Sequence, residues 1–540
     1  MSPSKLNGGE VSPLAPASSP QPVPERSRRA AAVSSATPLS GAVPRNAPQG
    51  FFPRVTLGDV AKVRSGFAFK SEHMGDHGCP IVKIRNISPP TVDIVNCEKV
   101  PESVIESIPD SDRFLLRSGD ILIAMTGATV GKIGKFPETS DAFYLNQRVG
   151  KVYLLENHAA DYAYIYHVLS QNSYSDLIFA AAEGSAQANI SGGQIERIEI
   201  PLPPISVQKS IAHILGTLDD KIELNRRINQ TLEEMAQALF KSWFVDFDPV
   251  RAKAAVYAAA NSDPTDPTVG IGHARSLRLG EQAELAAMRV ISGKTDDELV
   301  KFRQEQPDAY AELARTASLF PSRLTESDLG QIPEGWELAK LNQVCSYLAR
   351  GIGPSYCEPG EGAVRVLNQK CIRDGKVDIT PSRLHDSTKR SIQGRELHAL
   401  DILVNSTGQG TLGRTAQIGE SDSVTVVDSH VTVLRPDASK ISKLYLGINI
   451  RLREQEIESM AEGSTGQTEL SRIRLGELNV LVPELELLRT FDTSIEPVFQ
   501  QKMEMEKECS RLAECRDSLL PKLLSGELEI PDELLAEAAP

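Results

Sequence analysis

The chain has 540 residues, a formal net charge of −14 and a hydrophobic fraction of 40%. This length exceeds the usual size of a single hydrophobic core, so two or more domains are expected. No apolar run approaches the roughly 20 residues of a transmembrane helix, and the N-terminus lacks the apolar segment of a secretory signal, which predicts a cytoplasmic protein. The acidic balance counts against simple electrostatic binding to nucleic acid, although a binding groove needs only local positive charge.

In chain order, the sequence predicts two globular domains that alternate with two long helices. Short runs that alternate or carry β-branched residues, such as 120–124, predict strands, and helical stretches intervene, so the expected fold class is α+β. The predicted segments are a disordered Pro/Ser/Ala-rich tail at 1–50, a first globular domain at 51–204, a long helix at 205–245, a linker at 246–335 with one helix at 296–319, a second globular domain at 336–483, a second long helix at 484–526 and a tail at 527–540.

Short matches about 280 residues apart indicate that one module is used twice. Residues 57–60 (LGDV) recur as 341–344 (LNQV), and residues 119–127 (GDILIAMTG) recur as 400–408 (LDILVNSTG). The matches keep their order along the chain. On this alignment Lys83 corresponds to Arg365, Asn86 corresponds to Asn368, and Gln147 and Arg148 correspond to Ser429 and His430.

Each predicted module is followed by a helix with a heptad seam, and two such helices in a duplicated chain are expected to pack on each other. Some 35 residues make a rod of about 50 Å. The first seam is Ile211, Leu215, Leu218, Ile222, Asn225, Asn229, Leu232, Ala236, Leu239 and Trp243. The second is Phe491, Ile495, Val498, Lys502, Met505, Cys509, Leu512, Arg516, Leu519 and Leu523.

Polar residues interrupt both seams, Asn225 and Asn229 in the first and Lys502 and Arg516 in the second. Polar seam residues cost stability but can fix register and orientation. The alternative is that these stretches of the seam are simply solvated. Pro497 removes one hydrogen bond of the second helix and is expected to kink the helix or to mark its start.

The glycine-rich segment 127–132 (GATVGK) resembles a phosphate-binding P-loop but is one residue short, and Ile133 stands where a magnesium-binding Ser or Thr is needed. The second copy, 408–415 (GQGTLGRT), has Arg in place of Lys. A β-hairpin turn that brings Lys132 or Arg414 to a phosphate fits both copies, and a purely structural turn fits them equally. The chain offers no coherent catalytic constellation, and its Cys and His residues lack the spacing of a metal site.

Polar and basic residues that recur between the copies are the candidates for DNA contacts, because Arg, Gln and Asn read base edges. Capping of turns in a repeated fold is the alternative for each of them. The predicted DNA-binding residues are Lys83, Arg85, Asn86, Thr126, Lys132, Gln147, Arg148, Gln187, Arg365, Asn368, Thr407, Arg414, His430 and Gln467.

Several segments carry a family resemblance over about residues 51–530. They are 120–127 (DILIAMTG), 184–191 (GSAQANIS), 198–204 (IEIPLPP), 243–251 (WFVDFDPVR), 332–336 (IPEGW) and 519–527 (LLPKLLSGE). In this order they resemble the specificity subunit of type I restriction-modification systems. The second copy departs from the pattern, since Leu400 replaces Gly119 and Glu484 replaces Pro204.

The resemblance implies that each module is a target recognition domain that reads one half of a bipartite site in double-stranded DNA. It implies that the long helices pack antiparallel, set the gap between half-sites, and dock two methyltransferase subunits, which recruit two restriction subunits. No cofactor is then expected on this chain, because SAM, ATP and magnesium belong to the partners. Partners that cover the surface and supply phosphate contacts would explain the acidic charge, so the isolated chain should bind DNA weakly.

Two other functions stay open at this point. An acidic DNA mimic that inhibits a DNA enzyme would need an exposed stripe of carboxylates but would not need two modules. A P-loop ATPase would need the lysine and the magnesium ligand that the glycine-rich segments lack.

Overall fold

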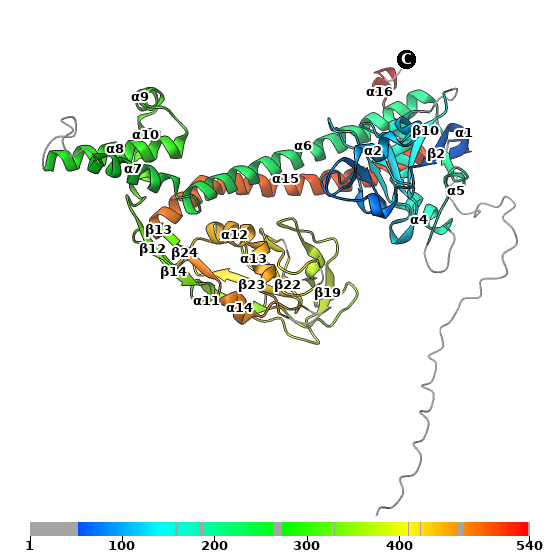
Figure 1. The fold of residues 1–540 in the computed structure, drawn as a ribbon. Coiled ribbons are helices and arrows are strands. Elements are labelled where there is room, and N and C mark those ends of the chain that lie inside the picture. Colours follow the sequence, from blue (N-terminus) through cyan, green and yellow to red (C-terminus); the bar gives the residue numbers. More distant parts are fainter. Residues whose placement is uncertain are drawn as a thin grey trace, which may run out of the picture.

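The computed structural model describes residues 52–156, 160–182, 188–262, 273–328, 330–408, 410–421, 423–462 and 468–537. Two mixed α/β modules are joined by two long helices that run side by side (Figure 1). Module 1 (residues 52–204) lies at one end of the helix pair, and module 2 (residues 336–483) lies beneath the other half. The predicted α+β architecture with paired long helices is confirmed. No helix among the described residues is both long and apolar enough to cross a membrane.

Module 1 is built around a six-stranded sheet with helices on one side. Its strand order is β2 (Ala61–Ser65), β10 (Val149–Leu154), β7 (Ile121–Ala124), β8 (Ile133–Lys135), β5 (Thr91–Val92) and β4 (Ile87–Ser88). A three-stranded sheet of β6 (Glu98–Val100), β3 (Cys79–Val82) and β9 (Tyr144–Leu145) adjoins it. A ribbon of β1 (Arg54–Thr56) and β11 (Glu199–Pro201) closes the module next to helices α3 (Tyr162–Leu169) and α4 (Asn172–Ala180).

Module 2 repeats this plan. Its main sheet has the order β15 (Cys345–Arg350), β23 (Val431–Pro436), β20 (Ile402–Asn405) and β21 (Thr415–Gln417). Beside it lie the sheet β19 (Arg383–Asp386), β16 (Ala363–Leu367) and β22 (Thr425–Val427), the hairpin β17 (Ile372–Arg373) and β18 (Lys376–Val377), and the closing ribbon β14 (Glu337–Lys340) and β24 (Asn479–Val482). The helices are α12 (Lys443–Leu452) and α13 (Glu454–Ser459).

Equivalent hydrogen bonds in the two modules confirm the duplication. The N–H of Met125 donates to the carbonyl of Arg148 at 3.0 Å, and the N–H of Ser406 donates to the carbonyl of His430 at 2.9 Å. The chain therefore runs through the same framework twice, with Arg148 and His430 at one position, as the repeat predicts.

The predicted pairing of Lys83 with Arg365 and of Asn86 with Asn368 is wrong by three residues. Lys83 precedes the 3₁₀ turn Ile84–Asn86, and Asn368 precedes the matching 3₁₀ turn Gln369–Cys371. The sequence match paired the two Asn residues, but the buried residues of the strands determine which positions correspond in the structure. Val82 and Leu367, both fully buried at the strand ends, occupy the same place.

The long helices α6 (Ile205–Phe244) and α15 (Leu485–Ser525) are antiparallel. Asp219 pairs with Arg516, whereas Glu233, further along α6, pairs with Lys502, which is earlier in α15. All the predicted seam residues lie buried or half-buried. Forty residues make α6 about 60 Å long. Pro497 lies inside α15 and not at its start.

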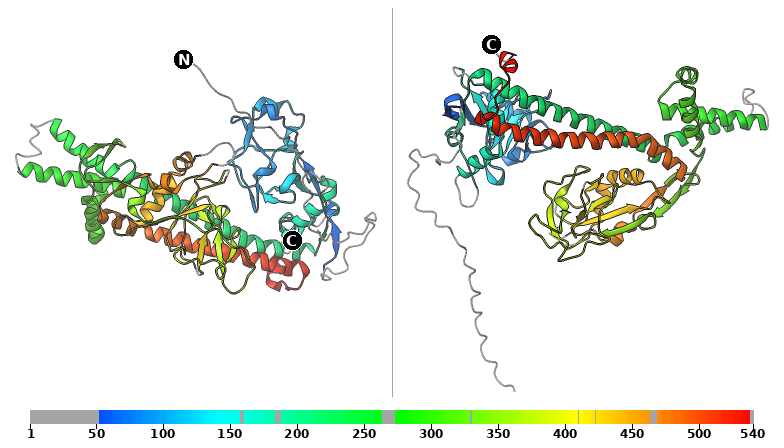
Figure 2. Two further views of the ribbon diagram at one scale, coloured as in Figure 1. Left: turned by 90° about the horizontal axis from the view of Figure 1, so that it is seen from below. Right: turned by 180° about the vertical axis from the view of Figure 1, so that it is seen from behind.

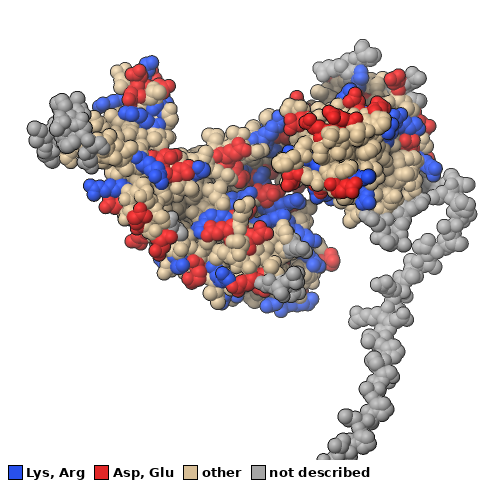
Figure 3. Space-filling model, viewed as in Figure 1, with Lys and Arg blue, Asp and Glu red and all other residues tan. Residues whose placement is uncertain are grey.

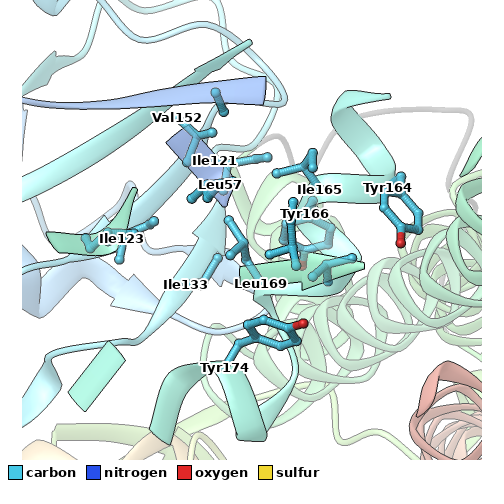
Figure 4. Close-up of a cluster of buried hydrophobic side chains, with 14 of the residues drawn as sticks. Leu57, Ile121, Ile123, Ile133, Val152, Tyr164, Ile165, Tyr166, Leu169 and Tyr174 are labelled. Carbon is cyan, nitrogen blue, oxygen red and sulfur yellow. The ribbon is translucent and has the colours of Figure 1, made fainter. Parts of the chain in front are cut away.

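Each end of the helix pair belongs to the core of one module. At the module 1 end, Ile211 and Leu215 of α6 and Leu523 of α15 join the cluster that contains Tyr164 and Ile165 of α3 (Figure 4). At the module 2 end, the corresponding cluster combines both helices with α12 and includes Phe240, Trp243, Phe244, Tyr445 and Phe491. Modules and helices are therefore fused through shared apolar cores.

The described residues between 248 and 318 form a helical arm that projects from the module 2 end of the helix pair (Figures 1 and 2). It consists of α7 (Asp248–Ser262), α8 (His273–Ser292), α9 (Asp296–Glu305) and α10 (Pro307–Ser318). The single helix predicted at 296–319 is thus two helices. Pro307 occupies the first turn of α10, a position where its missing N–H is tolerated, and it cannot continue α9.

Candidate nucleic-acid interface

The two glycine-rich segments form tight turns between antiparallel strands, β7 with β8 and β20 with β21. Gly131 has a φ of 85° and Gly413 a φ of 81°, a region that favours glycine. A Cβ at Gly131 would also lie 2.5 Å from the carbonyl oxygen of Ser175 on α4. The hairpin prediction is confirmed, and neither segment leads into the helix that a P-loop requires. Phosphate contact by Lys132 or Arg414 stays a prediction.

Three of the predicted site residues of module 1 come together in one surface depression. Thr126 follows β7, and Gln147 and Arg148 precede β10, the neighbouring strand. Gln147 and Arg148 are exposed, whereas the hydroxyl oxygen of Thr126 is buried and has no hydrogen-bond partner among the described residues. Ser65 and Asn189 line the same depression. We call these five residues the polar face of module 1.

Module 2 presents a corresponding set of side chains. Thr407 follows β20, and its hydroxyl lies 2.8 Å from Nδ1 of His430 and 3.3 Å from Oε1 of Gln369. Arg350 forms an ion pair with Glu469, whose backbone bridges to Thr407 as Asn189 bridges to Thr126. These five residues are the polar face of module 2. The faces share a place in the fold but differ in chemistry.

Sequence reasoning missed Asn189, Gln369 and Glu469 on these faces, and it also missed Ser65 and Arg350. Ser65 and Arg350 each precede a glycine that is hydrogen-bonded to the start of the neighbouring strand. The N–H of Gly66 donates to the carbonyl of Val149, and the N–H of Gly351 donates to the carbonyl of Val431. The signal that could have identified Ser65 and Arg350 is a residue-Gly pair at the end of the first sheet strand in each copy.

The other predicted site residues lie elsewhere. Lys83 and Arg85 both pair with Glu98. The amide oxygen of Asn86 accepts from the N–H of Lys83 at 3.0 Å, and its nitrogen donates to the carbonyl of Asn96 at 3.2 Å. This geometry favours the turn-capping alternative for Asn86.

Asn368 is held in the same way, since its amide oxygen accepts from the N–H of Lys370 at 2.8 Å and its nitrogen donates to the carbonyl of Pro381 at 2.7 Å. Arg365 lines a cleft between module 2 and the long helices instead of the polar face. Gln187 and Gln467 lie outside the described residues.

Charges of both signs are interleaved over the visible face of the two modules (Figure 3). Lys and Arg gather in small groups between Asp and Glu and form no continuous basic surface in this view. This distribution agrees with the acidic net charge. On this face the described residues give no long positive track of the kind that a self-sufficient electrostatic DNA binder carries.

A buried histidine marks the junction between module 1 and the helix pair. His167 on α3 is 4% exposed, and its Nδ1 lies 3.8 Å from Oδ2 of Asp219 on α6. Nη1 of Arg516 donates to Oδ1 of the same carboxylate at 2.7 Å. Burial lowers the pKa of His167 to about 4, although Asp219 favours the protonated ring.

This depressed pKa makes the stability of the module 1 end depend on pH. The His167 ring binds a proton near pH 6.5 in the unfolded chain but only near pH 4 in the folded chain. The free energy of unfolding is therefore highest above pH 6.5 and decreases as the pH falls towards 4. Between pH 7 and pH 5 we expect the free energy of unfolding to fall by about 1–2 kcal/mol, a loss that His167→Asn abolishes. Urea unfolding followed by circular dichroism at both pH values measures it. His213→Asn, an exposed position on α6, should keep the wild-type loss; an equal loss in His167→Asn would contradict the assignment.

Comparison with known proteins gives one consistent family. The family model described as "Type I restriction modification DNA specificity domain" matches residues 52–234. The chain is 29% identical over 447 residues to the type I restriction enzyme HindI specificity subunit of Haemophilus influenzae, covering 79% of this chain and 90% of that protein. It is 22% identical to the EcoBI specificity subunit of Escherichia coli, covering 88% and 86%.

A crystal structure of the type I restriction-modification S subunit from M. genitalium aligns with 89% of this chain and 97% of its own, at 15% identity and a TM-score of 0.44. The comparisons support neither a DNA mimic nor a P-loop ATPase. Taken with the duplicated module and the paired helices, the sequence matches show that this chain is similar to the specificity subunits of type I restriction-modification enzymes over most of its length.

Proposed function

We propose that this specificity subunit reads a bipartite site in double-stranded DNA, one half with each module. The observation that carries the proposal is the fusion of two equivalent modules to opposite ends of one antiparallel helix pair. Such a molecule presents two copies of one surface at a fixed separation, as dimeric DNA-binding proteins do for two half-sites.

The side chains on the two polar faces support reading of different half-sequences. Arg148 in module 1 is replaced by His430 in module 2, and Ser65 is replaced by Arg350. Guanidinium and imidazole groups offer different donors to base edges, so equivalent positions would select different bases. The expected target is therefore not a palindrome, because its two half-sites differ in sequence.

The outer surface of the helix pair supports docking of methyltransferase subunits, two per complex, with restriction subunits joining through them. Leu224 and Met235 are about half exposed on α6, at 50% and 57%. They are three helical turns apart, so they share one face, which points away from the buried seam. In this proposal the chain itself is non-catalytic and cytoplasmic, and the catalytic groups, SAM, ATP and magnesium belong to the partners.

Methylome sequencing of the host with and without the gene tests the function. Loss of one bipartite methylated motif, with all other motifs retained, is the expected result. An unchanged methylome, with the gene shown to be expressed in the parent strain, would contradict it.

The polar faces give a prediction specific to each half-site. Arg148→Ala should relax discrimination by about tenfold at base pairs of one half of the motif only, because a base-reading side chain contributes roughly 1–3 kcal/mol. His430→Ala should relax the other half only. Methylation of a randomised-site library by the reconstituted methyltransferase complex measures both.

Arg54→Ala is the matched control for these variants. Arg54 is an exposed arginine of module 1 that pairs with Glu199 on the closing ribbon, away from the polar face. It should leave both halves of the motif unchanged. Relaxation of both halves by Arg148→Ala, or of neither, would remove the polar face from the proposed contact surface.

A further inference from the structure

Two carboxylates of α6 lie where the helix pair and the modules meet, 14 residues apart. Asp219 is the first, and it contacts two other elements. Nη1 of Arg516 on α15 lies 2.7 Å from Oδ1, and Nδ1 of His167 on module 1 lies 3.8 Å from Oδ2. One carboxylate thus contacts the neighbouring long helix and the helix α3 through which module 1 packs.

Glu233 makes the corresponding junction for module 2. Nζ of Lys502 on α15 lies 2.8 Å from Oε2, and Nε of Arg451 on α12 lies 3.9 Å from Oε1. Glu454, the next acidic residue of module 2, holds the other side of Arg451 at 2.5 Å. Glu233 therefore contacts α15 and the helix α12 through which module 2 packs.

These pairs are screened from water more than ordinary surface ion pairs. The side chains of Asp219 and Glu233 are each 24% exposed, and that of Lys502 is 16% exposed. Partial burial strengthens the attraction within each pair and makes an unpaired charge at the same place costly. Exposed pairs on the same helix, such as Glu223 with Arg227, gain far less.

The pairs also distinguish the observed register from its neighbours. A slip of α15 by one heptad would place Cys509 or Leu523 opposite Asp219, and Ile495 or Cys509 opposite Glu233. Either slip keeps an apolar seam but leaves partly buried charges without partners. The amide of Asn225, which donates to Glu508 at 2.7 Å between the two junctions, adds to the same preference. The seam alone permits several registers, and these side chains permit one.

The separation of the junctions relates the register to DNA. Fourteen residues of α6 span about 21 Å, which corresponds to roughly six base pairs. Both modules contact this segment at its two carboxylates, beside the apolar cores that fuse them to the helix pair. A change of helix register would therefore move one module relative to the other along the DNA.

We propose that Asp219 and Glu233 are specificity-determining residues that set the number of base pairs between the two half-sites without contacting DNA. They fix the register of α6 against α15 and the position of each module on α6. The inference rests on the proposed function, since it concerns the gap within the bipartite site.

The test measures discrimination between gap lengths in the full methyltransferase complex. Duplexes carry the methylome-defined motif with its native gap or with one base pair more or fewer. Asp219→Asn and Glu233→Gln remove each charge at constant size. We expect each variant to raise the ratio of altered-gap to native-gap methylation by about fivefold or more, the effect of roughly 1 kcal/mol.

Glu223→Gln, an exposed carboxylate of the same helix, is the matched control and should keep the wild-type ratio. A variant that merely lowers stability reduces methylation of every duplex and leaves the ratio unchanged. An unchanged ratio in both junction variants overturns the inference while the proposed function stands. A wild-type complex that methylates no bipartite site overturns the proposed function and the inference together.

Discussion

Duplication of one heptad in each long helix is expected to abolish methylation at the native site and to create a site with a longer gap. The duplicated segments are 222–228 in α6 and 505–511 in α15, which face each other between the junctions of Asp219 and Glu233. Seven residues add about 10.5 Å, the length of roughly three base pairs. A heptad preserves the seam, so both ion pairs can form again.

The helical phase of DNA limits the new gap. Each added base pair turns the groove by about 34°, whereas a heptad rotates a helix face by only about 20°. We therefore expect a gap one to three base pairs longer and a loss at the native gap of about 100-fold or more, because one module then meets the wrong groove face. Methylome sequencing of a host that carries the variant measures the new gap.

Duplication in α6 alone is the control. The spacing between the two ion-pair positions is then longer on α6 than on α15, so the two ion pairs cannot form at the same time. Methylation should therefore be lost at every gap. A double duplication that still methylates only the native gap would show that the helix pair is not the element that sets spacing.

Phe491→Ala is expected to destabilise the module 2 end by about 3–5 kcal/mol, the usual loss for a large aromatic core residue. Phe491 is fully buried on α15, and its ring lies 5.0 Å from that of Phe244 and 5.8 Å from that of Trp243. The ring thus sits where α6 and α15 meet module 2. Its removal leaves a cavity in the cluster that joins all three.

Tryptophan fluorescence isolates this transition, because both Trp residues of the chain, Trp243 and Trp336, belong to the same cluster. The urea midpoint of the fluorescence signal should fall strongly. Ile211→Ala, the equivalent position in the module 1 core, should shift circular dichroism but leave the fluorescence midpoint near that of wild type. Phe179→Ala, at 52% exposure, should change neither signal. Equal fluorescence shifts in the Ile211 and Phe491 variants would show that the two ends unfold as one unit.

The paired helices were predictable because a heptad seam is a long, redundant pattern. Asn225 and Lys502 fall on the seam, and the structure gives them partners, Glu508 and Glu233. Those partners were not identifiable from the seam, because which charges meet depends on the register of two segments about 280 residues apart. The sequence thus indicated the polar positions and left their pairing open.

Within the modules, sequence matching failed where a shared residue type conflicted with burial. Asn86 and Asn368 look equivalent, yet each caps the same turn from a different position, because fully buried Val82 and Leu367 set the strand register. Hairpin turns and the positions of Arg148 and His430 were predictable, since short, ordered matches fix them. The polar faces as sets were not, because Arg350 reaches its face from a strand distant in sequence.

The composition of the module 1 core has a consequence for biosynthesis. Leu57 and Leu215 share one cluster with Leu523 and Ile530, which follow much later in the chain. A ribosome therefore translates the segments from Leu57 to Ile530 before this core can close. Module 2, whose core draws on α6 and the first half of α15, has its contacts available sooner. Module 1 is translated before module 2 but is thus expected to reach its native packing after it, with its apolar surface open to chaperones until then.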